Sequence, residues 1–168
     1  MSYNRLFVFL LVLLLFSSCG GNSDYAYNEF VASQYKSVSA EFEASYEKLI
    51  NGEYKTTYDL QGGYDGDRKE VRNLRNNTKR TIENVNELIP SDNAKKLHDK
   101  LNEYFKLVGE EYTAYADSYL NIDCECPEKR DSVVTQIKAL YGKISSVEDD
   151  ALELQLEFMK KSGMKPKE

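Results

Sequence analysis

The hydrophobic positions of this chain recur at the three- and four-residue spacing of packed helices. From about Tyr25 to Asn51, apolar and aromatic residues are separated by four, four, three, four, four and three positions, so they form one helix face. Asn51 and Gly52 are typical helix-ending residues. The inward positions are Tyr27, Val31, Tyr35, Val38, Phe42, Tyr46 and Leu49.

Two more helices follow on the same pattern. The second spans about Asp67 to Ile89 and stops at Pro90, which has no N–H to continue it. The third runs from about Asp92 to Leu120, with Ser91 or Asp92 as its N-cap. We expect these helices to bury Val71, Leu74, Thr78, Ile82, Val85 and Leu88, then Ala94, Leu97, Leu101, Tyr104 or Phe105, Val108, Tyr112, Tyr115 and Tyr119.

A fourth helix begins at Pro127, which suits a first helical turn, and ends near Gly163 and Pro166. Such regular spacing favours near-parallel packing, so we predict an all-α fold, an elongated antiparallel up-down-up-down four-helix bundle. The segment 53–66 is long for a helix connection and indicates a small extra element or a site of interest. The inward positions of the fourth helix are Val133, Ile137, Leu140, Ile144, Val147, Ala151, Leu154 and Phe158.

The start of the chain has the pattern of a secretory leader. Arg5 precedes an unbroken apolar run from Leu6 to Phe16, too short for a good membrane span, and Ser17, Ser18 and Cys19 follow. This ending resembles the lipobox of bacterial lipoproteins, in which the cysteine thiol is joined to diacylglycerol. Phe16 in place of leucine is similar to lipoproteins of the Bacteroidota. The alternative is an ordinary secretory leader that contains a cysteine.

These features predict a domain order and a location. We expect a lipoprotein signal peptide over 1–18, a lipidated tether over 19–24, the bundle over 25–163 and a tail over 164–168. Two or more acyl chains, palmitate among them, would hold Cys19 stably in a bilayer. No Asp follows Cys19 directly, which by resemblance to enteric sorting rules favours the outer membrane of the cell envelope. Its periplasmic and surface faces both remain open.

Composition narrows the class of partner. The net charge of −6 becomes −7 when Arg5 leaves with the leader. A chain this acidic in the envelope is not expected to bind nucleic acid. The 150 residues from Cys19 onward suit one compact domain.

Cys124 and Cys126 are the two cysteines left once Cys19 is lipidated, and the compartment is oxidising. The favoured interpretation is a local disulfide that staples the turn between the third and fourth helices. A redox or soft-metal site for copper(I) or zinc is the second, although two ligands alone hold metal poorly. Free or intermolecularly paired thiols are the third.

The single histidine limits the catalytic chemistry. We expect His98 on the polar face of the third helix, exposed to solvent. No nucleophile and base can be paired around it, and no c-type haem attachment motif is present. The sequence therefore predicts neither an enzyme nor a cofactor.

Tyrosines form a second candidate group. The third helix carries four on one side, and one on the fourth can approach them, so a seam for a flat polar ligand such as carbohydrate or peptide is one interpretation. The favoured alternative places them at the core margin with their hydroxyls in water. The five are Tyr104, Tyr112, Tyr115, Tyr119 and Tyr141.

The second helix carries a basic stripe of Arg68, Arg72, Arg75 and Lys79. It could receive anionic glycan or lipid head groups. We favour pairing with acidic residues of an adjacent helix, such as Glu153 or Glu157. Separately, the triplet Asp131, Ser132 and Val133 resembles the O-glycosylation site of Bacteroidota, with Ser132 as acceptor, and it also suits a first helical turn.

Several short motifs resemble a family of uncharacterised surface lipoproteins from spirochaetes and Bacteroidota. They are Cys19, Tyr27-Asn28, the Leu88-Ile89-Pro90 break, and the tail from Leu156 to Lys161 before Ser162-Gly163. The resemblance implies a single helical-bundle domain at the envelope, and no catalytic residue is carried over from it. We expect a non-enzymatic binding or structural module that contacts the bilayer through Cys19 and an envelope protein or glycan elsewhere. The alternative is a redox or metal-handling lipoprotein that uses Cys124 and Cys126.

Overall fold

The computed structural model describes residues 23–60 and 65–164. These residues form helices and no strand, which confirms the all-α class. The elements are α2 (Ser23–Ile50), the short α3 (Thr57–Leu60), α4 (Gly66–Asn86), α5 (Lys95–Lys106), a π-helical segment η1 (Leu107–Tyr112), α6 (Thr113–Leu120) and α7 (Pro127–Lys161). The leader, Cys19 and most of the tether lie outside the described residues, as do 61–64 and 165–168.

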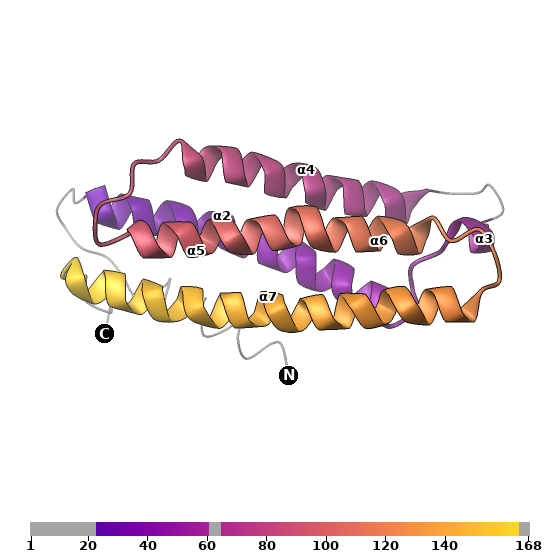
Figure 1. Ribbon diagram of the computed structural model, residues 1–168. Coiled ribbons are helices and arrows are strands. Elements are labelled where there is room, and N and C mark those ends of the chain that lie inside the picture. Colours follow the sequence, from indigo (N-terminus) through magenta and orange to yellow (C-terminus); the bar gives the residue numbers. More distant parts are fainter. Residues whose placement is uncertain (1–22, 61–64, 165–168) are drawn as a thin grey trace.

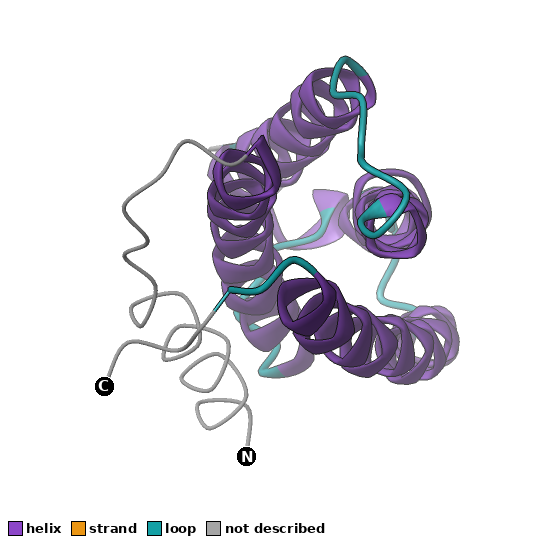
Figure 2. Cartoon of the chain, turned by 90° about the vertical axis from the view of Figure 1, so that its left-hand side faces the viewer, coloured by secondary structure: helices purple, strands orange, loops and turns teal. Residues whose placement is uncertain are grey.

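The long helices lie lengthwise beside one another. In Figure 1, α2 and the continuous α5–η1–α6 run from left to right, whereas α4 and α7 run from right to left. Figure 2 looks along these axes and shows the helices surrounding a common interior. The α2 and α7 helices, which are far apart in sequence, are joined by buried contacts such as the 3.0 Å hydrogen bond from Gln155 Nε2 to Asn28 Oδ1.

The third predicted helix is correct in position but wrong in detail. It starts at Lys95, and neither Ser91 nor Asp92 caps it with a side chain; the N–H of Ala94 donates to the carbonyl of Ser91 at 2.9 Å. A π-helical turn then interrupts it at Leu107–Tyr112, around Gly109. A Cβ at Gly109 would lie 2.7 Å from Thr78 Cγ2, so η1 and α4 approach more closely than a side chain permits.

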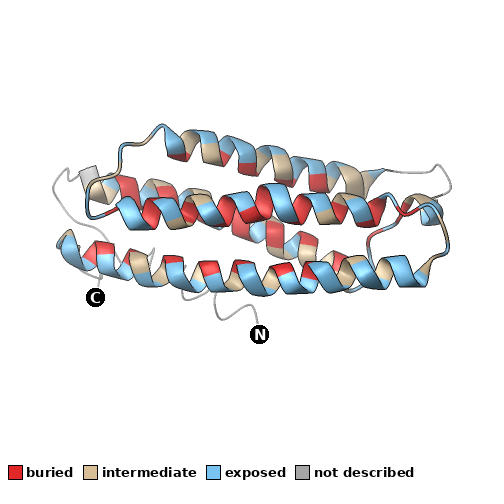
Figure 3. Cartoon of the chain, in the orientation of Figure 1, coloured by how far each residue is buried: buried red, intermediate tan, exposed pale blue. Residues whose placement is uncertain are grey.

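The inward face of each predicted helix supplies the core, which Figure 3 shows as red bands on the inner sides of the helices. Both Tyr104 and Phe105 are buried, although the spacing left a choice between them. Positions near the edge of the core are only half-buried: Tyr46, Ile82, Leu88, Tyr115, Val133 and Leu154. The long connection after α2 contains α3, which is the small extra element that its length suggested.

Candidate functional site

Cys124 and Cys126 form a disulfide in the turn between α6 and α7, which is the first of the three interpretations. Their Cα atoms lie 5.2 Å apart, and the N–H of Cys126 donates to the carbonyl of Cys124 at 2.8 Å. Both residues are half-buried. Within the described ranges, no cluster of three or more His, Cys, Asp or Glu side chains is arranged to hold a metal ion.

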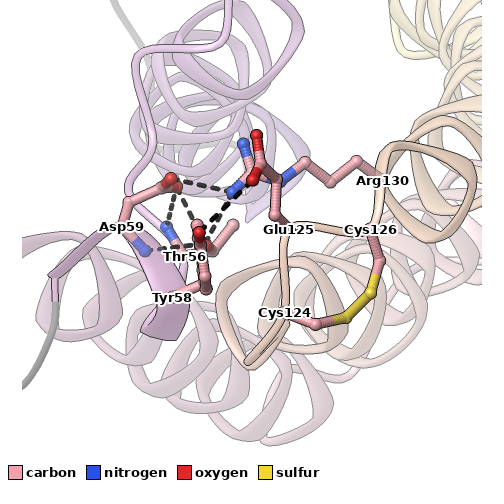
Figure 4. The surroundings of a disulfide bond; sticks show 7 residues. All are labelled: Thr56, Tyr58, Asp59, Cys124, Glu125, Cys126 and Arg130. Carbon is pink, nitrogen blue, oxygen red and sulfur yellow. Dashed lines mark hydrogen bonds and ion pairs between the residues drawn. A yellow bond between two sulfur atoms is a disulfide. The ribbon is translucent and has the colours of Figure 1, made fainter.

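The short helix α3 is bound to this turn by polar contacts (Figure 4). Arg130 Nη2 donates to Asp59 Oδ1 at 2.8 Å and to Thr56 Oγ1 at 3.1 Å. The hydrogen bond from Arg130 is the largest of the effects that lower the pKa of Asp59 to about 2. On the same side, Tyr58 Oη donates to Glu125 Oε2 at 3.4 Å.

Arg68, in the first turn of α4, contacts both α3 and the end of α6. It donates to the Leu120 carbonyl at 3.0 Å and to Thr57 Oγ1, and it lies 3.4 Å from Asp65. Four segments therefore converge around the disulfide: α3, the start of α4, the end of α6 and the start of α7. We call this region, residues 54–60, 65–68 and 118–133, the disulfide end.

The disulfide end contains a groove of about 440 Å³ between the end of α6 and the start of α7. Its charged lining groups are of both signs, because Asp123 and Glu128 lie beside Lys129. Ser132, the O-glycosylation candidate, is exposed at its wall. The complete lining is Ser118, Asn121, Ile122, Asp123, Glu128, Lys129, Ser132 and Val133.

One member of the basic stripe, Arg75, pairs with an acidic residue of an adjacent helix, as favoured, but that helix is α6 and not the fourth predicted helix. Arg75 donates to Thr113 Oγ1 and to the Thr113 carbonyl, both at 3.0 Å, and forms an ion pair with Asp117. Glu157 lies on α7 and binds Lys161 of its own helix at 2.6 Å. Glu153 is exposed on the same helix.

Arg72 and Lys79 are exposed, and the end of the stripe borders a second groove. This groove has a volume of about 430 Å³ and lies between α4 and the π-helical segment. Its lining residues are Arg75, Lys79, Ile82, Glu83, Gly109 and Glu110.

Tyr112 is fully buried and begins a chain of hydrogen bonds through the core. Its hydroxyl lies 2.7 Å from Ser45 Oγ, which in turn lies 2.8 Å from Tyr54 Oη. Tyr54 donates to Glu70 Oε1 at 3.2 Å, and Glu70 Oε2 binds Lys48 at 2.5 Å. Because the carboxylate can only accept, each hydroxyl can donate in the same direction, from Tyr112 toward Glu70.

The remaining candidate tyrosines lie in the hydrophobic core or at its margin. Tyr104 is fully buried against Tyr35, with ring centroids 5.1 Å apart, and Tyr119 is buried near the disulfide end. Tyr141 stacks on Tyr46 at 4.1 Å. Tyr115 and Tyr141 are the two half-buried members. The interpretation of all five as core-margin residues with hydrated hydroxyls is therefore wrong for Tyr104 and Tyr112, whose hydroxyls are inside the core.

His98 is buried, which overturns its expected exposure. Its Nδ1 lies 3.2 Å from Tyr27 Oη, and burial lowers the pKa of the imidazole, although Asp99 acts in the opposite sense. Buried polar residues at Asn28 and Gln155 were also missed. No local signal marks them, because each is polar and becomes acceptable inside only through a partner on another helix.

None of the described helices combines the length and the apolar character required to cross a membrane. No family model, curated protein or solved structure matches this chain.

Proposed function

We propose that this chain is a lipid-anchored protein of the bacterial envelope whose helical domain acts as a non-enzymatic binding or structural module. The observation that carries the proposal is the apolar leader followed directly by Cys19, four positions before α2 begins at Ser23. Acylation there would tether the start of α2 at a bilayer, with the outer membrane as the favoured location. The resemblance to surface lipoproteins supports the same assignment.

The helix directions in Figure 1 support an elongated up-down-up-down four-helix bundle as the scaffold of this module. In this interpretation α5, η1 and α6 together form the third member. At 1.5 Å per residue, the 28 residues of α2 and the 35 of α7 correspond to about 42 and 52 Å. Such a scaffold separates its two ends by a distance larger than a bilayer core.

A binding role is supported by the structural contacts that engage the chemically reactive side chains of the domain. The cysteine pair is closed as a disulfide, His98 is hydrogen-bonded in the core, and Arg75 is paired with Asp117. The groove at the disulfide end combines an opening of about 440 Å³ with mixed polar groups. We propose it as the surface that receives an envelope protein or glycan.

Metabolic labelling with palmitate tests the anchor. We expect the label on the wild-type protein and on a Cys124→Ser/Cys126→Ser variant, and its loss in Cys19→Ala. A label that persists in Cys19→Ala, or is absent from the wild type, would contradict the anchor.

Capture of partners from solubilised membranes tests the binding surface. Asn121→Trp places a large ring in the groove at the disulfide end, whereas Asn76→Trp makes the same change on an exposed position of α4. We expect Asn121→Trp to lose the partners that wild type and Asn76→Trp retain. Equal capture by both variants would place the surface elsewhere.

The alternative function is redox or soft-metal handling by Cys124 and Cys126, which is supported by their half-buried position in a surface turn. Thiol titration and metal analysis separate the two functions. For a binding module we expect the pair to stay unreactive without reductant, to yield two thiols after reduction, and to bind no copper(I) or zinc. Trapping of a partner as a mixed disulfide would favour the redox function.

A further inference from the structure

The end of the molecule opposite the disulfide end gathers the start of α2, the α4–α5 connection and the end of α7 (Figure 1). Ser162 Oγ donates to Asp24 Oδ2 at 2.5 Å, which joins the end of α7 to the start of α2. The ring of Tyr27 packs on Phe158 at 5.9 Å, and its hydroxyl contacts His98. We call this region, residues 23–28, 87–98 and 158–164, the α2 end.

The most exposed large apolar side chain among the described residues belongs to the α2 end. Ile89 is 96% exposed, compared with 50% for Leu156 and 40% for Tyr58. It lies in the α4–α5 connection between Leu88 and Pro90, which are both half-buried. A single exposed apolar residue is ordinary in itself, so any role of Ile89 depends on where it lies in the molecule.

That position is set by the proposed acylation at Cys19, on which this inference rests. Four residues of chain span at most about 14 Å, so Ser23 cannot lie farther than this from the lipidated cysteine. The helices therefore meet the bilayer at or near the α2 end, where Ile89 is exposed. Lys95, Lys96 and Lys160 are exposed there and can reach phosphate groups, while Glu87 and Asp92 are the exposed acids beside Ile89.

We propose that the α2 end docks on the bilayer that holds Cys19, with Ile89 inserted at the level of the head groups. The helix axes then point away from the membrane, and the disulfide end is held out to meet other envelope components. The occupant of the Ile89 surface is lipid, because the anchor brings this surface to the membrane and no apolar side chain of the described residues covers it. The isoleucine acts as a second contact that limits tilting about the tether.

Tryptophan fluorescence provides a direct test, since the chain contains no tryptophan. Ile89→Trp places a probe at the α2 end, and Tyr58→Trp places a reference probe at an exposed position of the disulfide end. Each full-length acylated protein is reconstituted into phosphatidylethanolamine and phosphatidylglycerol vesicles, with or without brominated acyl chains. We expect blue-shifted, bromine-quenched emission from Ile89→Trp and unshifted, unquenched emission from Tyr58→Trp.

Flotation of the vesicles distinguishes failure of this inference from failure of the anchor. Protein that floats with the vesicles but gives unquenched Ile89→Trp emission would overturn the docking and leave the anchor intact. Quenching of both probes would mean that the domain lies flat, which also overturns it. Protein that does not float with the vesicles would contradict the anchor, and therefore the docking as well.

Amide hydrogen exchange gives a readout without substitution. Docking predicts that residues 87–94 exchange more slowly in the vesicle-bound acylated protein than in the same protein released into solution by removal of its acylated segment. Residues 54–60 should exchange equally in both states. Equal exchange over 87–94 in the two states would contradict it.

Discussion

Replacing Gly109 with alanine should destabilise the protein, although alanine is normally the better helix former. A Cβ at this position would lie 2.7 Å from Thr78 Cγ2 and 2.9 Å from Thr78 Cβ. The second atom is fixed to the α4 backbone, so rotation of the threonine side chain cannot remove the clash. The π-helical segment and α4 must therefore separate locally.

The size of the effect follows from two opposing contributions. Overpacking of a well-filled core costs about 1–3 kcal/mol. Glycine to alanine in a helix gains about 1 kcal/mol. Gly142 in α7 is the matched control, because an added Cβ there meets nothing within 4 Å. We expect Gly142→Ala to be more stable than wild type, and Gly109→Ala to be about 1–3 kcal/mol less stable than Gly142→Ala.

Urea unfolding followed by circular dichroism at 222 nm measures both variants. Adding Thr78→Ser to Gly109→Ala removes the methyl group at 2.7 Å and keeps the hydroxyl that donates to the Leu74 carbonyl at 2.7 Å, so part of the loss should return. If Gly109→Ala were as stable as Gly142→Ala, the close approach of η1 to α4 would be refuted.

Three further predictions concern polar groups. Arg130 lowers the folded-state pKa of Asp59 to about 2, so the pair stabilises the fold above the ordinary carboxyl pKa and loses this contribution as pH falls toward 2. When the free energy of unfolding is measured against pH in acid, Asp59→Asn should therefore lose less stability than the wild type. Burial lowers the pKa of His98, so stability should fall as pH decreases below about 6.5, and His98→Gln should remove this dependence. A dependence unchanged in His98→Gln would contradict its assignment. Tyr112→Phe should cost about 1–2 kcal/mol through its lost buried hydrogen bond, whereas Tyr115→Phe at a half-buried position should change unfolding free energy by less than about 0.5 kcal/mol.

The proposed orientation gives the two ends of the molecule different roles. Ile89 and the start of α2 would belong to the membrane contact, and the groove beside the disulfide to partner binding. The polar contacts of Arg130 and Arg68 tie α3 to the same end, so this surface is held by side chains from several segments. A partner would therefore meet a preorganised surface, which lowers the entropic cost of binding.

The helices and their inward faces could be predicted from the sequence alone, because hydrophobic spacing is a local property of each helix. Val31, Leu74 and Ile144 were placed correctly for this reason. The close spacing of Cys124 and Cys126 likewise indicated their disulfide. Other features appear only when the helices pack together: the partner of Arg75, the π-helical turn at Gly109, and the burial of polar groups such as His98 and Tyr112. Each depends on which helix lies opposite, and a spacing rule within one helix carries no information about its neighbour.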